Sequence, residues 1–253
     1  MVAKGHVVLV HAFPLNAELW KRQAQALPDG WTLLAPELPG FGRSQASPLS
    51  SMDDLADAVF RAMDDAGIER AVIGGLSMGG YITLAMYRRA PHRFSGMILA
   101  DTRATADTDQ QKENRRKAIA TVREKGAAAI ADDMLPKLLG ETTRREQPLL
   151  IQEVRGMIEG NSPDAIAGAL EAMMGRPDST AMLPGIDLPT LIVCGDEDVL
   201  TPPSDSQALH AAIRGSRLDM IKGAGHLSNI EGPDAFSRAL ASFLASVSPT
   251  GHQ

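Results

Sequence analysis

Short runs of apolar, often β-branched residues alternate along the chain with longer stretches in which apolar positions repeat every three to four residues. The short runs have the character of buried strands, and the periodic stretches that of amphipathic helices. Six runs are predicted as strands, the last with the weakest pattern: 6–13, 31–38, 70–77, 94–102, 188–196 and 217–225. Such alternation is typical of crossover units, so we expect an α/β fold with a mostly parallel sheet and helices on both faces.

Helices are predicted after several of these strands, with recognisable signals at their ends. Residues 51–68 begin with a capping serine, carry acids in the first turn and reach a glycine at the end. Residues 78–91 end at a proline, and residues 233–247 begin with a proline at a first-turn position. The tail, residues 248–253, is expected to be disordered.

One long region interrupts the alternation of strands and helices. Between residues 103 and 186 no segment has a convincing strand pattern, and the region contains no Phe, Trp or Tyr. Helix signals occur there in three segments: 107–126, 145–160 and 162–175. We therefore predict a core of residues 1–102 and 187–253 with a helical cap inserted at 103–186. The lack of aromatic residues in this cap favours an aliphatic, adaptable pocket.

Composition and charge narrow the class of protein. The 253 residues are 44% hydrophobic and 22% charged, which is ordinary for a soluble globular protein. The net charge is −6, and no cluster of Lys and Arg forms a stripe, so nucleic acid is not expected as a partner. The first residues lack the apolar region of a signal peptide, and no stretch has the length of a membrane span. We expect a cytoplasmic protein that does not act at a membrane.

A single cysteine limits the possible metal and redox chemistry. Cys194 lies within the apolar run "TLIVCG", where a small buried side chain is the simplest interpretation. One cysteine cannot form an internal disulfide, a cysteine zinc site or a redox pair. We therefore predict no metal and no cofactor.

The turn between the strand at 70–77 and the helix at 78–91 carries a candidate nucleophile. Its sequence "GLSMG" fits Gly-x-Ser-x-Gly in the strand–turn–helix context that this motif requires. Ser77 is predicted on a tight turn, because the glycines remove Cβ atoms that would collide with the strand and the helix. The N–H of Met78, at the helix N-terminus, can then stabilise an oxyanion. The alternative is a purely structural Gly-Ser-Gly turn.

A serine hydroxyl needs a base, and the base needs an acid that orients it. Among the six histidines, His226 lies in a Gly-rich loop after the last predicted strand, from which it can reach Ser77. A structural loop histidine is the alternative. Three candidates for the acid follow the fifth strand: Asp196, Glu197 and Asp198. Asp101 ends a strand at the same edge of the sheet, and the residues alone do not rank these carboxylates.

Several segments together resemble the α/β-hydrolase superfamily, over nearly the whole chain. In chain order they are "HAFPLN", "ELPGFGRS", "GGLSMGG", "GDEDVLTPP" and "GAGHLSNIEGP". The resemblance implies the α/β-hydrolase fold, with about six strands, a reduced N-terminal hairpin and a helical cap. The finer resemblance is to small bacterial esterases and to the 3-oxoadipate enol-lactonase-like group.

The resemblance also implies roles for individual residues. Asp198 aligns with the acid of the family, and Asp101 stays open as its substitute. Phe13 aligns with the residue that supplies the second oxyanion N–H, and His11 with a residue that shapes this loop. Ala12 departs from the family, which usually has glycine there, and we expect this departure to restrict the loop.

We predict a serine hydrolase that cleaves carboxylic esters through a Ser-His-Asp triad and an acyl-enzyme. The substrate is expected to be a small-molecule ester or lactone, and assembly into a homo-oligomer is left open. Four alternatives share the scaffold: an enol-lactonase, a carbon–carbon bond hydrolase, an acyltransferase and a non-catalytic ligand receptor. Four side chains are candidates for substrate contacts, with core packing as the alternative for each: Trp20, Met134, Met157 and Met174.

Overall fold

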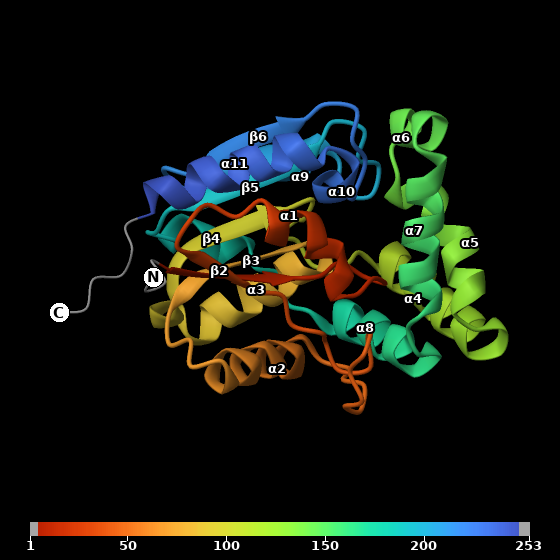
Figure 1. Ribbon diagram of the computed structural model, residues 1–253. Helices are drawn as coiled ribbons and strands as arrows, with labels where there is room; N and C mark the ends of the chain where they lie inside the picture. Colours follow the sequence, from red (N-terminus) through yellow and green to blue (C-terminus); the bar gives the residue numbers. More distant parts are fainter. Residues whose placement is uncertain (1–4, 248–253) are drawn as a thin grey trace.

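The computed structural model describes residues 5–247, and its central feature is a six-stranded sheet (Figure 1). All neighbouring strands are parallel, in the order β2-β1-β3-β4-β5-β6. The strands are β1 (Gly5–Val10), β2 (Trp31–Leu34), β3 (Ala71–Leu76), β4 (Phe94–Ala100), β5 (Thr190–Gly195) and β6 (Arg217–Ile221). The predicted parallel sheet is confirmed, and within the described residues no antiparallel hairpin precedes it. The tail predicted to be disordered, 248–253, lies outside the described residues.

Helices cover both faces of this sheet (Figure 1). On one face α1 (Lys21–Gln25) packs against α11 (Pro233–Ser246), which also contacts β5 and β6. On the other face α2 (Met52–Asp65) packs against α3 (Met78–Arg89), which lies on β1, β3 and β4. The helix α9 (Pro203–Ala212) contacts β5 and β6. Among residues 5–247, no helix combines the length and the apolar composition needed to cross a membrane.

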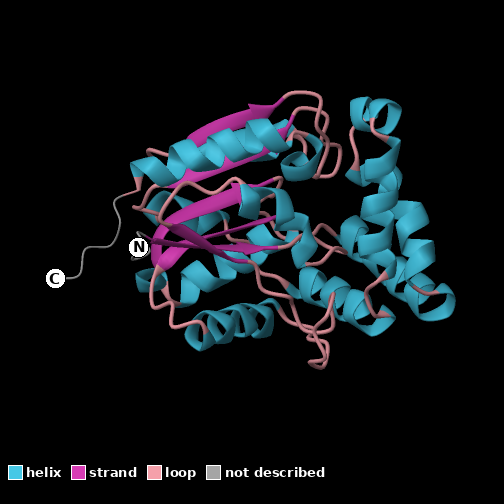
Figure 2. Cartoon of the chain, in the orientation of Figure 1, coloured by secondary structure: helices cyan, strands magenta, loops and turns pink. Residues whose placement is uncertain are grey.

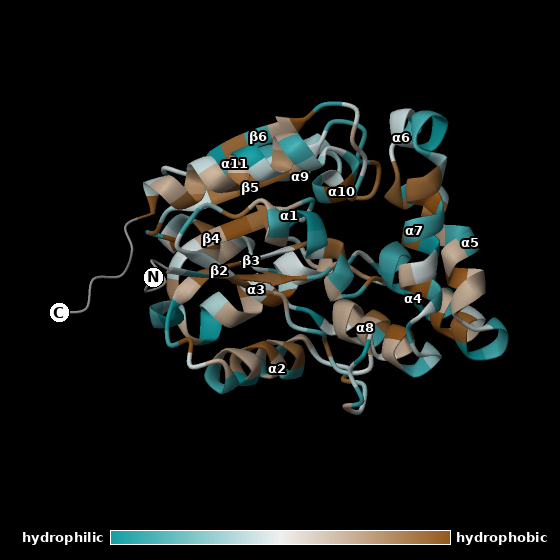
Figure 3. Cartoon of the chain, viewed as in Figure 1, coloured by the Kyte–Doolittle hydropathy of each residue, from teal (hydrophilic) through white to brown (hydrophobic). Residues whose placement is uncertain are grey.

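The core follows from this double cover of the sheet. Strands that are packed on both faces bury every side chain, so they are apolar throughout rather than alternating. All residues of β3 and of β5 are buried, and the central strands are largely brown in Figure 3. The apolar runs that predicted these strands are therefore the interior of the molecule.

All six strands are shorter than the predicted runs, and the two largest differences each have a local reason. The run at 31–38 is a strand only as far as Leu34, because Pro36 has no amide hydrogen with which to continue the ladder. The run at 217–225 ends as a strand at Ile221, because Gly223 turns the chain with a φ of 70°.

Five helices lie between β4 and β5, within the region predicted as a cap. They are α4 (Asp109–Lys125), α5 (Ala127–Leu138), α6 (Glu141–Glu146), α7 (Pro148–Glu159) and α8 (Pro163–Gly175). Figure 2 shows these segments as helices joined by loops, standing beside the carboxyl ends of the strands. These helices cover the edge of the sheet at which Ser77 lies.

Hydrogen bonds fasten the cap helices to loops of the core. The side chain of Asn161, between α7 and α8, accepts from the N–H of Gly42 at 2.7 Å and donates to the carbonyl of Pro14 at 2.7 Å. At the last residue of α5, the carbonyl of Leu138 accepts from the backbone N–H of His226 at 3.0 Å. The cap therefore shares hydrogen bonds with the loop that carries the candidate base.

Candidate active site

Ser77 lies in the turn between β3 and α3 with a strained backbone. Its φ is 57° and its ψ −112°, in a region that L-residues rarely occupy. The turn is tight because the chain passes directly over its neighbours: a Cβ on Gly75 would lie 2.4 Å from the carbonyl carbon of Gly79. A Cβ on Gly79 would lie 2.2 Å from the carbonyl oxygen of Val10. The glycines at both positions are thus required by close backbone approach.

Ser77, His226 and Asp198 form one continuous chain of hydrogen bonds. The Nε2 atom of His226 lies 2.7 Å from Ser77 Oγ, and its Nδ1 atom lies 2.8 Å from Asp198 Oδ2. Because a carboxylate only accepts, Nδ1 carries the proton and Nε2 is free to accept from the serine hydroxyl. All three side chains are buried, with at most 9% of the residue exposed. The arrangement can activate the serine for nucleophilic attack.

Asp198 is held as a carboxylate by several donors. Its Oδ1 accepts from the N–H groups of Leu200 and Thr201, and its Oδ2 accepts from the hydroxyl of Thr201 at 2.6 Å. Burial opposes ionisation, but the charge of His226 and the hydrogen bonds of His226 and Thr201 outweigh it and lower the pKa of Asp198. Asp198 therefore stays ionised and keeps the imidazole oriented.

Asp101, the alternative acid, makes no hydrogen bond to His226. It is fully buried at the end of β4, and its carboxylate accepts from the N–H of Gly195 at 2.8 Å and from the hydroxyl of Ser228. Burial, and next the charge of Asp198, raise the pKa of Asp101 well above that of an ordinary aspartate. Asp101 thus joins the loop of the candidate acid to the loop of the candidate base.

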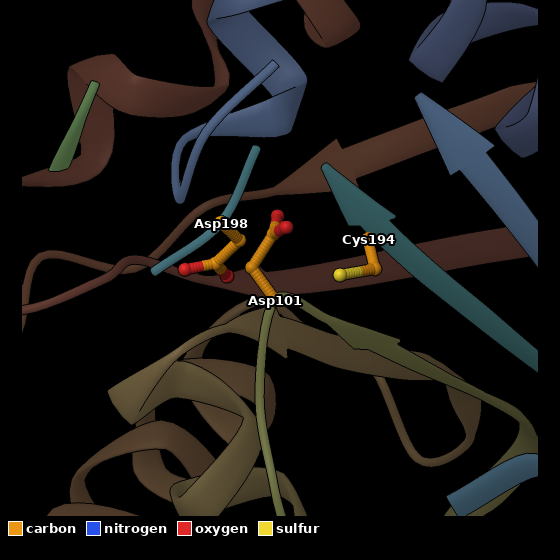
Figure 4. Close-up of side chains that lie close together, drawn as sticks. All are labelled: Asp101, Cys194 and Asp198. Carbon is orange, nitrogen blue, oxygen red and sulfur yellow. The ribbon is translucent and has the colours of Figure 1, made fainter. Parts of the chain in front are cut away.

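Figure 4 shows Asp101, Asp198 and Cys194 close together at the ends of neighbouring strands. Their potential ligand atoms lie within 4.8 Å of one another. Both carboxylates already accept hydrogen bonds from protein donors. Burial raises the pKa of the Cys194 thiol, which therefore keeps its proton and is a poor metal ligand. Hydrogen bonding explains this cluster without a metal ion.

Two backbone N–H groups are the candidates for the oxyanion hole, those of Phe13 and Met78. Phe13 lines the cavity with Ser77, and Met78 is the first residue of α3. Within residues 5–247, neither N–H donates a hydrogen bond to a protein acceptor, so both are free for a substrate oxygen. Their role in an oxyanion hole stays a prediction.

His11 supports the loop that carries Phe13. Its Nδ1 lies 3.0 Å from the carbonyl of Ala12, and its Nε2 accepts from the N–H of Leu38 at 3.3 Å. Burial lowers the pKa of His11 to about 4, so the ring is neutral near pH 7. The imidazole joins the loops that follow β1 and β2.

A cavity of about 340 Å³ opens above Ser77 and His226, beneath the cap. Its core side is formed mainly by Phe13, Tyr81, Leu200 and Thr201, and α5 and α8 add apolar side chains. The helix α4 and its neighbours contribute polar and charged groups, contrary to the aliphatic pocket expected from the sequence. These groups are Arg103, Asp107, Gln111, Asn114, Arg115, Asp133 and Lys137.

Only one of the four predicted substrate contacts lines this cavity, Met134 of α5. Trp20 does not line the cavity: the residue is 1% exposed, and its ring packs against Phe236 at a centroid distance of 5.9 Å. Met157 and Met174 do not line it either, because Met157 is buried in the hydrophobic core and Met174 packs against that core. The neighbouring Met173 faces the cavity instead.

Sequence reasoning missed two sets of functional residues. Thr201, which holds Asp198, follows it by three positions in "GDEDVLTPP", and its hydroxyl was the available signal. On α4 the signal was the spacing of Gln111, Asn114 and Arg115, which places them on one face of the helix. A polar face on a cap helix resembles a solvated face in sequence, so it was not singled out.

Comparison with known proteins supports the fold over almost the full described length. The chain matches the family model described as "alpha/beta hydrolase fold" over residues 5–233. It is 26% identical over 240 residues to 3-oxoadipate enol-lactonase 2 of Acinetobacter baylyi, covering 94% of this chain and 88% of that protein. It is 28% identical over 247 residues to the pimeloyl-[acyl-carrier protein] methyl ester esterase of Neisseria meningitidis serogroup C, covering 95% of this chain and 94% of that protein.

Solved structures give the same result. A thermophilic esterase from Thermogutta terrifontis, in a malate-bound form, matches with a TM-score of 0.94 and 38% identity, covering 98% of this chain and 92% of that chain. An enol-lactonase from Burkholderia xenovorans LB400 matches with a TM-score of 0.88 and 28% identity, covering 96% and 92%.

Proposed function

Because the chain belongs to the alpha/beta hydrolase fold family, we propose that it hydrolyses carboxylic esters through Ser77, His226 and Asp198. The observation that carries this proposal is the unbroken path of hydrogen bonds, 2.7 Å and 2.8 Å long, on the floor of a cavity of about 340 Å³. The esterases among the relatives support the same reaction class.

The proposed reaction has two halves. His226 takes the proton from Ser77 Oγ as this oxygen attacks the ester carbonyl carbon, and the imidazolium is stabilised by Asp198. The N–H groups of Phe13 and Met78 donate to the carbonyl oxygen as it becomes negative, and one such donor contributes about 3 kcal/mol. His226 returns the proton to the departing alcohol, which leaves the acyl group on Ser77.

Water completes the cycle. His226 accepts a proton from a water molecule, whose oxygen attacks the acyl carbon. The proton then returns to Ser77 Oγ as the carboxylic acid leaves. The side chains and backbone groups named here are sufficient for these steps.

Purified protein should turn over p-nitrophenyl esters of short acids and be labelled on Ser77 by a fluorophosphonate. Ser77→Ala should reduce kcat by about 10⁴-fold or more and abolish labelling, while its circular dichroism spectrum stays that of the wild type. Ester turnover by Ser77→Ala at the wild-type rate would refute the proposed nucleophile. A wild-type protein that neither hydrolyses nor labels would indicate a receptor on the same scaffold.

Lactone hydrolysis is the second candidate. The names of the enol-lactonases from Acinetobacter baylyi and Burkholderia xenovorans favour it, and a lactone is an internal ester that the same residues can open. A kcat/KM for lactones far above that for open-chain esters of similar size would favour this candidate. Products containing an added alcohol, or cleaved carbon–carbon bonds, would instead indicate acyl transfer or a carbon–carbon bond hydrolase.

A further inference from the structure

The cap presents one polar wall to the cavity that contains Ser77. We define this cap wall as Gln111, Asn114 and Arg115 of α4 together with Lys137 of α5, all of which line the cavity. Positions 111, 114 and 115 share one helical face, because residues three and four apart are neighbours on an α-helix.

The cap wall offers donors rather than acceptors. The N–H of Thr108 can only donate, and it does so to Gln111 Oε1 at 2.8 Å, so the amide NH₂ of Gln111 stays available. Asn114 Oδ1 likewise accepts from the side chain of Gln110 at 3.1 Å. Among the described residues, no protein acceptor binds the NH₂ of Gln111, the NH₂ of Asn114 or the Nη1 of Arg115.

The cap wall carries two positive charges, those of Arg115 and Lys137, and each pairs with an aspartate that also lines the cavity. The carboxylate of Asp107 is shared by two arginines, Arg115 with an Nε–Oδ2 distance of 2.5 Å and Arg176 with an Nη1–Oδ1 distance of 2.7 Å. The other ion pairs beside the cavity are one to one: Lys137 with Asp133, and Arg103 with Asp205. Arg115 therefore shares its carboxylate partner with Arg176, which also interacts with Asp178, and the Nη1 of Arg115 stays available to a ligand.

We propose that the cap wall binds a carboxylate at the non-reacting end of the substrate, so that half esters of short dicarboxylic acids are preferred. This inference rests on the proposed ester hydrolysis. A carboxylate is an acceptor-only group that can bind the free donors and form a charge-assisted hydrogen bond with Arg115. A neutral chain in the same place would leave the half-buried donors of Gln111 and Arg115 without a partner. The cavity of about 340 Å³ restricts the substrate to a small molecule.

Matched substrates test this proposal directly. The test compares hydrolysis of the monomethyl and dimethyl esters of succinic, glutaric and adipic acid, with p-nitrophenyl acetate as a neutral reference. At least one half ester should have a kcat/KM about tenfold above that of its diester, mainly through a lower KM. Turnover of p-nitrophenyl acetate with equal or better hydrolysis of all three diesters overturns this inference and leaves the proposed function intact. Failure to hydrolyse any ester overturns both.

Neighbouring arginines provide a matched pair of variants. Arg115→Gln should lower the ratio of half-ester to diester kcat/KM about tenfold, since one charge-assisted hydrogen bond is lost. Arg116→Gln should keep this ratio, because Arg116 is 60% exposed and pairs with Glu113 outside the cavity. Lys137→Met, at a half-exposed position, provides a second test and should also lower the ratio. A ratio unchanged in Arg115→Gln and Lys137→Met, or lowered equally in Arg116→Gln, contradicts the assignment.

Discussion

At the scale of single residues, strain and burial distinguish the functional positions. Within residues 5–247, Ser77 and Asp101 are the non-glycine residues with positive φ, and both lie at carboxyl ends of adjacent strands. The sequence predicted Ser77 and His226 because their motif and loop context are local. The residues alone did not rank Asp198 against Asp101, because both follow strands at the same edge and the path of the loops decides which one reaches the imidazole. The resemblance to the family favoured Asp198.

Asparagine substitutions distinguish these two aspartates. Asp198→Asn should reduce kcat by about 10⁴-fold, because an amide can no longer hold the required tautomer of His226. Asp101→Asn should have a far smaller effect, because the amide oxygen can still accept from the N–H of Gly195. Steady-state kinetics with one p-nitrophenyl ester measures kcat for both variants. An inactive Asp101→Asn beside an active Asp198→Asn would reverse the assignment.

His11 should make the stability of the protein depend on pH. Its pKa is about 4 in the folded protein and 6.5 ordinarily, so between these values the unfolded chain binds a proton that the folded chain does not. Stability is therefore present above pH 6.5 and is lost as the pH falls toward 4.

The variant His11→Gln isolates this effect, since an amide can replace both hydrogen bonds of the ring without titrating. Between about pH 7 and pH 4.5, the wild type should lose about 2–3 kcal/mol more of its unfolding free energy than this variant loses. Urea unfolding at the two pH values measures the difference. Equal losses would mean that His11 is not the buried neutral histidine described above.

At the scale of elements, the strands and the main helices of the core could be predicted from the pattern of apolar residues and from the capping, glycine and proline signals at element ends. Errors occurred at element ends, where Pro36 and Gly223 terminate strands that hydrophobicity alone would extend. The charged face of α4 was not predicted, because its position beside a cavity depends on contacts between segments far apart in the chain. The periodicity of a helix identifies its polar face, but it does not show which part of the molecule that face packs against.

Replacement by alanine should have opposite effects on stability at two glycines, one in the turn that carries Ser77 and one in a cap helix. Gly79→Ala should lower the unfolding free energy by about 1–3 kcal/mol, because the new Cβ would lie 2.2 Å from a backbone oxygen of β1. In α7, the Cβ added by Gly156→Ala would have no other atom within 4 Å, so this variant should raise the unfolding free energy by about 0.5–1 kcal/mol. Thermal or urea unfolding measures both, and a stable Gly79→Ala protein would contradict the described packing.

At the scale of the whole molecule, the cap and the core form one site. The core supplies the reacting groups, whereas α4 and α5 supply the polar wall, and polar side chains join the two. The helical character of the region between β4 and β5 could be predicted from its lack of strand patterns. The joining contacts could not, because Asn161 bonds to backbone groups more than a hundred residues earlier in the chain.

Asn161 should therefore affect both stability and catalysis. Asn161→Ala leaves the N–H of Gly42 and the carbonyl of Pro14 without their partner, and should cost about 1–3 kcal/mol of unfolding free energy. It should also lower kcat/KM, because the loop that carries Phe13 loses its support.

The adjacent Ser162 is the matched control for this variant. Its side chain caps α8 through the N–H of Ala165 and is exposed, so Ser162→Ala should cost about 1 kcal/mol and leave kcat/KM unchanged. Equal kinetic losses in the two variants would show that general loosening of the cap, and not this anchor, is responsible.

The hydrogen bond from the His226 backbone to Leu138 has a consequence for recombination between homologous genes. A chimera that exchanges the region from β4 to β5 also exchanges the carbonyl that fixes the amide of the proposed base. New specificity acquired by such a graft would come with altered proton transfer. Chimeras joined after Leu139 should retain more turnover than chimeras joined before it, since the native acceptor is kept.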